Sequence, residues 1–148
     1  YIGHGCGYKG GDAYNTAVGF ECGYNMVSGA QYNSLYGFKC GRSITTADKM
    51  TAIGYQSGYN MSTGQAQQGQ SVLIGVEAGY NLNGDNCVMI GTQVGYGHTT
   101  GIYTASNCVY IGNACAYEGG GSNNTAIGFE CGKNMSTGAN NVMVGYQC

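Results

Sequence analysis

Asn15-Thr-Ala-Val-Gly-Phe-Glu-Cys-Gly23 returns later in the chain, with Ile in place of Val, as Asn124-Thr-Ala-Ile-Gly-Phe-Glu-Cys-Gly132. Weaker copies of this stretch occur throughout the sequence, and each contains a Gly that follows Ile, Val or, once, Tyr. These anchor glycines are separated by 16 to 21 residues, and they are Gly3, Gly19, Gly37, Gly54, Gly75, Gly91, Gly112, Gly128 and Gly145. The chain is therefore a tandem repeat, and its fold has to place like copies in like positions.

Each copy predicts a short strand followed by a turn. In Thr125-Ala-Ile-Gly128 the larger side chains lie two residues apart, which is the period of a β-strand. A second Gly comes four residues after the anchor in all but one of the copies where that position exists, and it is able to turn the chain because Gly readily adopts positive φ. These second glycines are Gly7, Gly23, Gly41, Gly58, Gly79, Gly95 and Gly132, with Ala116 as the exception.

The repeat length selects the architecture. Helix-pair repeats need about 33 residues or more, which is longer than any copy here. Copies stacked about 4.8 Å apart pair every strand with the next and place like residues over like. The sequence therefore predicts an all-β fold: a parallel β-solenoid (β-roll) of about nine rungs, each of 16–21 residues. Residues 1–148 are expected to form a single repeat domain, a segment of a longer fibrous chain.

The pattern also gives an expectation for the core. We expect the two β-branched positions of each strand to point inward, and the position between them to point outward. That middle position holds Ala17, Leu35, Ala52, Leu73, Met89, Tyr110, Ala126 and Met143. A core of two side chains per rung is thin, and an apolar stripe that faces outward is expected to be shielded from solvent by another chain. We therefore expect the chain to associate with copies of itself, three around one axis; the alternative is a flattened coil that buries both strand faces internally.

Composition excludes several classes of protein. Charged residues make up 8% of the chain, and there are 29 Gly, 14 Tyr, no Pro and no Trp. A low charge with many aromatic residues indicates order, because disordered chains have the opposite profile. Five scattered Lys and Arg residues cannot form the basic patch that nucleic acid requires. No apolar stretch approaches the roughly 20 residues of a membrane helix, so we expect no membrane insertion.

The repeats resemble those of a known group of proteins. Met50-Thr-Ala-Ile-Gly-Tyr-Gln-Ser-Gly58 and the Asn-Thr-Ala-Ile-Gly cores resemble β-roll repeats of phage and viral tail fibres, and head repeats of trimeric autotransporter adhesins. The resemblance covers almost the whole chain. It implies a trimeric β-roll that acts outside the cell, on a virion or a cell surface, as a fibre shaft or an adhesive head.

The eight cysteines fall into two columns. Six lie three residues after an anchor glycine (Cys6, Cys22, Cys40, Cys115, Cys131 and Cys148), and Cys87 and Cys108 share another position. They are either buried thiols that act as small apolar groups, or disulfides between adjacent rungs or neighbouring chains. The rung spacing lies within the Cα separation of about 4.4–6.8 Å that a disulfide allows. Secretion favours bridges, and the pairs to test are Cys22–Cys40, Cys87–Cys108 and Cys131–Cys148.

Surface chemistry provides further candidates. One column holds Tyr8, Tyr24, Tyr59, Tyr80, Tyr96 and Tyr117. Stacked rings there would close a corner of the coil, which we favour, or exposed rings would stack on glycans. Asn60, Asn123 and Asn134 begin N-glycosylation motifs. Loop-tip hydroxyls are candidates for O-linked sugars, at Thr45-Thr46, Ser62-Thr63, Thr99-Thr100 and Ser136-Thr137.

No set of residues predicts catalysis or cofactor binding. There is no Cys-x-x-Cys motif, and His4 and His98 are isolated, so zinc spacing is missing. Glu21, Glu77 and Glu130 share a column with Lys and Gln, as on a solvated face. The sequence therefore predicts a structural protein with no cofactor: an extracellular fibre or shaft, part of a phage or viral tail fibre or a cell-surface appendage. The alternatives are an adhesin head that binds glycans or a host receptor, and a self-assembling extracellular glycoprotein filament.

Overall fold

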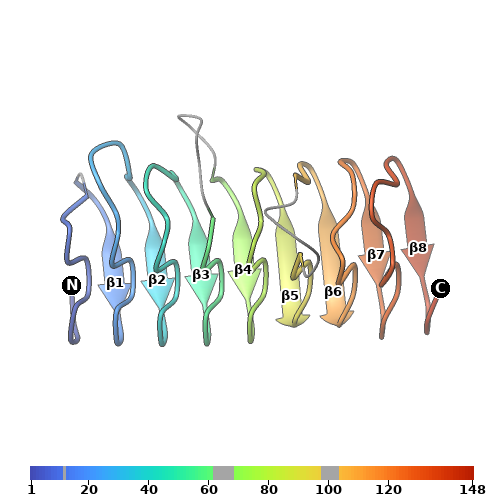
Figure 1. Ribbon diagram of the computed structural model, residues 1–148, viewed down its shortest axis with the longest axis horizontal. Helices are drawn as coiled ribbons and strands as arrows, with labels where there is room; N and C mark the ends of the chain where they lie inside the picture. Colours follow the sequence, from blue (N-terminus) through green and yellow to red (C-terminus); the bar gives the residue numbers. More distant parts are fainter. Residues whose placement is uncertain (12, 62–68, 98–103) are drawn as a thin grey trace.

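The computed structural model describes residues 1–11, 13–61, 69–97 and 104–148, and it contains no helix within these ranges. Eight short strands form one parallel sheet in which each strand lies beside the next one along the chain (Figure 1). The strands are β1 (Thr16–Val18), β2 (Ser34–Tyr36), β3 (Thr51–Ile53), β4 (Val72–Ile74), β5 (Val88–Thr92), β6 (Val109–Asn113), β7 (Thr125–Ile127) and β8 (Val142–Val144).

The strands pair with the register that the repeat predicts. Ala17 lies opposite Leu35, Leu35 opposite Ala52, and the same middle position is matched through to β8. The return side of each turn is hydrogen-bonded from rung to rung as well, for example from the Gly41 N–H to the Ser57 carbonyl at 2.9 Å. Two hydrogen-bonded sides, stacked along one axis, confirm the predicted parallel β-solenoid.

The number of strands differs from the nine rungs expected. The first copy of the repeat adds one isolated bridge, from Ile2 to Val18, and no strand of its own. The eight strands are linked by seven parallel pairings, so the described solenoid has about seven turns. The longest strands, β5 and β6, also pair Gly91 with Gly112 and Thr92 with Asn113.

The anchor glycines are required by the stacking itself. Their φ angles run from 128° at Gly3 to 149° at Gly145, a region that side chains rarely adopt. A Cβ atom added at Gly54 would lie 2.1 Å from the carbonyl oxygen of Gly75 in the next rung. The repeat therefore keeps Gly at this position because the backbones of successive rungs touch there.

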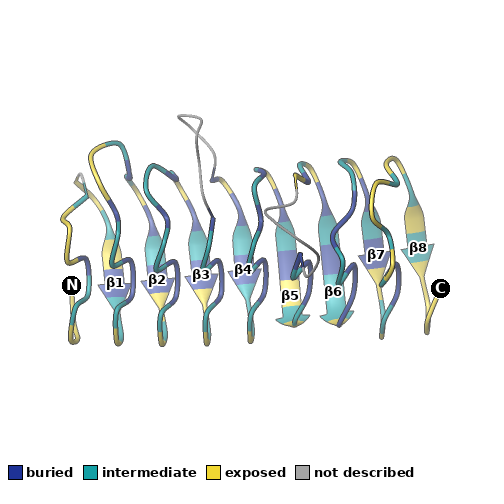
Figure 2. Cartoon of the chain, viewed as in Figure 1, coloured by how far each residue is buried: buried dark blue, intermediate teal, exposed yellow. Residues whose placement is uncertain are grey.

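The expected orientation of the strand side chains is wrong, and the reverse is found. The middle residues Leu35, Leu73 and Met89 have no exposed surface, whereas Ile53 is 40% exposed and Ile90 is 37% exposed. The burial colours of Figure 2 show buried strand centres from β1 to β7, whereas the centre of β8 is only partly buried. The alternative of a coil that buries both strand faces is excluded for the same reason, because the third position of several strands remains exposed.

The interior has room for only one strand side chain per rung, because the return side of the turn fills the rest. Two buried columns project from that side. The first holds Cys22, Cys40, Ser57, Ala78, Val94, Cys115 and Cys131, and the second holds Met26, Ile44, Met61 and Leu82. The middle strand residues meet these two columns and complete a narrow, continuous core.

Candidate functional site

The most extensive candidate is the outer surface of the sheet, which we call the apolar face. It combines the first and third strand positions with the residues that follow the anchor glycines. The first positions are Thr16, Ser34, Thr51, Val72, Val88, Val109, Thr125 and Val142; the third are Val18, Tyr36, Ile53, Ile74, Ile90, Ile111, Ile127 and Val144. The column after the anchor contributes Phe20, Phe38, Tyr55, Val76, Phe129 and Tyr146, and is interrupted by the polar Thr92 and Asn113 in β5 and β6.

This face is exposed, ordered and uncharged. Ile127 is 36% exposed, and Phe38 and Tyr55 are 40% and 46% exposed. Phe38 stacks on Phe20 with ring centroids 5.2 Å apart, and on Tyr55 at 5.3 Å. None of the three columns contains Lys, Arg, Asp or Glu. Contiguous apolar surfaces of this kind mark interaction sites in proteins, so the face is a candidate interaction surface.

A polar corner borders the aromatic column. It holds Glu21, Lys39, Gln56, Glu77, Gln93, Glu130 and Gln147, all with φ near 50°. Gln93 Nε2 donates a 2.9 Å hydrogen bond to Glu77, and Gln147 Nε2 donates a 2.8 Å hydrogen bond to Glu130. The Lys133 ammonium, and then Gln147, lower the pKa of Glu130. The carboxylates are therefore spaced along the axis and paired with Gln or cationic partners, as expected of a solvated face.

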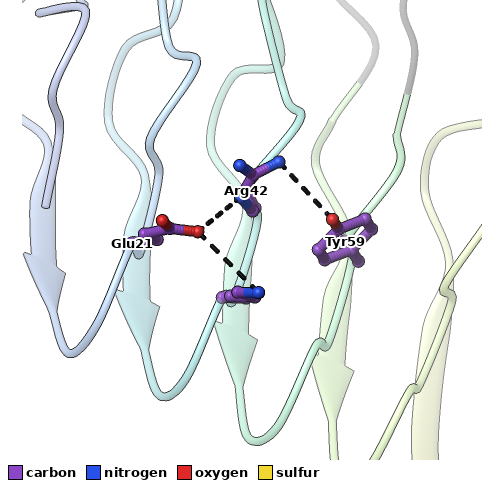
Figure 3. A network of polar contacts seen from close by, with 4 residues as sticks. Glu21, Arg42 and Tyr59 are labelled. Carbon is purple, nitrogen blue, oxygen red and sulfur yellow. Dashed lines mark hydrogen bonds and ion pairs between the residues drawn. The ribbon is translucent and has the colours of Figure 1, made fainter. Parts of the chain in front are cut away.

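One polar network fills a gap in the tyrosine column (Figure 3). The Arg42 Nε atom lies 2.7 Å from Glu21 Oε2, and Lys39 Nζ lies 4.0 Å from the same oxygen. The guanidinium of Arg42 stands 5.2 Å from the Tyr24 ring and 5.9 Å from the Tyr59 ring. A hydrogen bond to Glu21 raises the Arg42 pKa. Arg42 thus takes the place of a missing ring by cation–π contact with the ring on either side.

The predicted tyrosine column does stack. Tyr8 and Tyr24 have ring centroids 4.8 Å apart, and the run of Tyr59, Tyr80, Tyr96 and Tyr117 has spacings of 4.9, 5.0 and 5.3 Å. Within these runs the ring faces lie against one another. This geometry supports the structural role over glycan stacking, because a sugar ring would need a free aromatic face.

All eight cysteines are thiols in the structure. In the column of six, Cys40 Sγ donates to the Ala52 carbonyl at 3.1 Å and Cys115 Sγ to the Ala126 carbonyl at 3.1 Å. Ser57 occupies the same column and donates to the Leu73 carbonyl at 2.9 Å. Ser57 thus makes the same kind of bond as Cys40 and Cys115, whereas Ala78 and Val94 fill the column without a donor.

Burial and neighbouring thiols together shift the thiol pKa values. Burial raises the pKa of Cys115 to about 12 and that of Cys131 to about 11. In the second column, Cys87 Sγ donates to the Ala105 carbonyl at 3.2 Å, and its pKa is raised first by the thiol of Cys108. The candidate pairs thus lie in neighbouring rungs, and disulfide formation between them stays a prediction.

The three glycosylation candidates differ in whether their side-chain amides are already hydrogen-bonded to neighbouring residues. Asn123 Nδ2 donates to Asn140 at 3.1 Å, and its oxygen accepts from Asn107 at 3.2 Å. Asn60 Nδ2 donates to Asn81 at 3.2 Å, and Ser62 of its motif lies outside the described residues, as do Thr63, Thr99 and Thr100. Asn134 is exposed together with Ser136 and Thr137, so its motif is the most accessible of the three.

A buried asparagine ladder was not foreseen. Asn33 Nδ2 donates to the Ala47 carbonyl at 2.7 Å, and its oxygen accepts from Met50 N–H at 3.0 Å. Asn124 repeats the arrangement with the Asn141 N–H at 2.9 Å. The signal was present in the sequence, since Asn stands directly before the strand in the best-preserved copies. These amides satisfy backbone groups where the chain enters the strands at the two ends of the solenoid.

The comparisons with known proteins add no relative: no family model, curated protein or solved structure matches this chain. Among the described residues, no group of three or more His, Cys, Asp or Glu could hold a metal ion. Within the same residues, no helix is long and apolar enough to cross a membrane.

Proposed function

We propose that this chain is a segment of an extracellular structural fibre, part of a phage or viral tail fibre or a cell-surface appendage. In this fibre, copies associate side by side through the apolar face, three around one axis. The observation that carries the proposal is the exposure of Ile53, Ile90 and Ile127 on a regular, uncharged sheet surface. The resemblance of the repeats supports the trimer and the extracellular location, and the first copy of the repeat would add a ninth rung.

The periodicity of the face favours a copy of this chain as the partner. Its side chains recur at the rung spacing, about 4.8 Å, from β1 to β8. A partner with another spacing would lose register with these rows within a few rungs, whereas a second copy keeps it along the whole length. The matched rows of Thr, Val and Ile can then interdigitate without any charge to desolvate.

The size of the face is adequate for a stable interface. Eight rungs at about 4.8 Å give a length of about 40 Å, and the five residues from the first strand position to the residue after the anchor glycine give a width of about 17 Å at about 3.3 Å each. The plan area is therefore about 680 Å², and the accessible area of a side-chain surface exceeds its plan area. This is comparable with the roughly 800 Å² that a stable interface buries on each partner.

A charge placed on the face tests the proposal. The double variant Ile53→Lys with Ile90→Lys puts two cations on the sheet surface, and sedimentation or light scattering measures the mass in solution. The matched control, Ser28→Lys with Ala139→Lys, adds the same charge at exposed loop positions away from the sheet. We expect the parent and the control to be trimers, and the face variant to be a monomer with an unchanged far-UV spectrum.

The other outcomes are distinct. A parent chain that stays monomeric at high concentration contradicts self-association, and a dimer contradicts the threefold arrangement alone. The less supported alternative is an adhesin head, because the rings of the tyrosine column cover one another's faces. A glycan array probed with the isolated segment separates the two functions.

A further inference from the structure

Two pairs of tyrosines in neighbouring rungs have stacked rings, and three of the four tyrosines are exposed; Tyr24 is half-buried. Tyr14 and Tyr32 have centroids 5.0 Å apart and an interplanar angle of 6°. They are 73% and 50% exposed. Tyr8, which is 69% exposed, stacks on Tyr24 at 4.8 Å. None of these four residues belongs to the columns of the apolar face.

The position of Tyr14 and Tyr32 does not require an aromatic ring. Both have positive φ, at 69° and 58°, in a corner column that later rungs fill with Lys49, Gln70 and Asn86. Because polar side chains serve there equally well, the rings are not needed for the turn. A stacked pair contributes only about 0.5–1.5 kcal/mol beyond burial, and these rings are largely in solvent. What distinguishes the pair is that two accessible phenols are held against each other.

We propose that Tyr14 and Tyr32 are a site of oxidative cross-linking, at which a haem peroxidase with hydrogen peroxide joins the two rings as dityrosine. Tyr8 and Tyr24 form a second site of the same kind. The product is a covalent staple between consecutive rungs of one chain. The proposal is independent of how copies associate, because both tyrosines of each pair lie in the same chain.

The chemistry balances with one molecule of hydrogen peroxide. Each phenol gives up one electron and one proton to the oxidant and becomes a tyrosyl radical. The two radicals form a carbon–carbon bond between ring carbons ortho to the hydroxyls, and each ortho proton then moves to the phenolic oxygen. The two phenols are restored, the chain has lost two hydrogen atoms, and the peroxide has been reduced to two water molecules.

Geometry favours coupling within the chain over coupling between chains. Two rings held 5.0 Å apart meet far more often than rings that must diffuse together, which is the advantage of any preorganised intramolecular reaction. The solvent on the open side of Tyr14 and Tyr32 leaves room for the rings to tilt edge to edge. Tyr80, in the longer stack, is only partly exposed, and burial raises its pKa. We therefore expect the exposed pairs to react first.

The chain contains its own negative controls. Tyr55 is 46% exposed and Tyr146 is 71% exposed in the single chain, so an oxidant reaches both when the chain is monomeric. Each stacks on a phenylalanine, Phe38 and Phe129 respectively, with centroids 5.3 Å apart. Phenylalanine has no phenol and forms no such radical. Stacking and exposure are thus matched, and only the chemistry of the neighbouring ring differs.

The test is peroxidase treatment of the full chain, kept dilute enough to be monomeric so that the apolar face is open to the oxidant, followed by peptide mapping. Cys148, the exposed thiol, is alkylated first so that it does not consume oxidant. We expect dityrosine fluorescence in a band of single-chain mass on a denaturing gel, and a peptide pair joined through Tyr14 and Tyr32 that is lighter by two hydrogen atoms. Tyr32→Phe keeps the stack and loses this peptide, whereas Phe38→Tyr gains a cross-link to Tyr55.

Three results would overturn the inference. The first is dityrosine found only between chains in the parent protein. The second is a Phe38→Tyr variant that gains no cross-link to Tyr55 while its far-UV spectrum matches that of the parent. The third is a Tyr14–Tyr32 peptide of equal yield when the chain is oxidised in denaturant, because the folded stack would then contribute nothing to the coupling.

Discussion

Truncation of Leu73 measures whether the middle strand residues hold the solenoid together. Leu73 lies at the centre of β4 with no exposed surface. Cβ atoms built on Gly58 and Gly79 would both lie 3.0 Å from its Cδ carbons, so the backbones of two successive rungs rest directly on this side chain. Leu73→Ala leaves a void that neither backbone can fill, because both are fixed by hydrogen bonds to adjacent rungs.

The expected loss in the free energy of unfolding is about 3–5 kcal/mol, the upper part of the range for buried Leu-to-Ala changes. The matched control is Ile53→Ala, since Ile53 is 40% exposed on the apolar face. In the monomer, that change removes a partly solvated side chain and costs about 1 kcal/mol. The two variants thus separate the buried face of the strands from the outer one.

The assay is urea unfolding followed by far-UV circular dichroism, at a chain concentration low enough to keep every variant monomeric. Repeating it at high concentration adds the contribution of association, which we expect to be lost in Ile53→Ala and retained in Leu73→Ala. Equal losses for the two monomers, or a larger loss for Ile53→Ala, would refute the orientation of the strands and with it the apolar face.

Three further outcomes follow from particular contacts. Gly54→Ala forces a Cβ against the Gly75 carbonyl and is expected to cost more than about 3 kcal/mol, whereas Gly10→Ala meets the backbone strain of a φ of 103° but nothing within 4 Å of its Cβ, and should cost less; thermal melts compare the two. Tyr110→Phe removes a buried hydroxyl that lacks a hydrogen-bond partner and should stabilise the chain by about 1 kcal/mol, so a lower melting temperature would contradict this. Because burial raises the thiol pKa of Cys115 from 9.0 to about 12, its contribution to stability is complete below pH 9.0 and is lost as the pH rises toward 12; unfolding free energies measured from pH 8 upward should fall, and a rise would contradict the assignment.

The sequence predicted the architecture because the repeat constrains the backbone directly. Successive rungs touch at Gly54 and Gly75, where no side chain fits between them, so Gly recurs at intervals that reveal each turn. Stacking then places each residue over the residue at the same position of the next copy. This fixes the register that pairs Leu35 with Ala52. The stacked tyrosines could be predicted for the same reason.

What only the tertiary structure decided is which face of each strand is inside. A period of two separates two faces without saying which one is buried, and here both are apolar. The choice depends on the opposite wall of the coil, where Met26 and Cys22 already fill the interior. Only one strand side chain per rung can meet that wall, so Leu35 is buried and the Ile53 column is left outside. The size of the interior, rather than the hydrophobicity of the residues, therefore determines which face of each strand is buried.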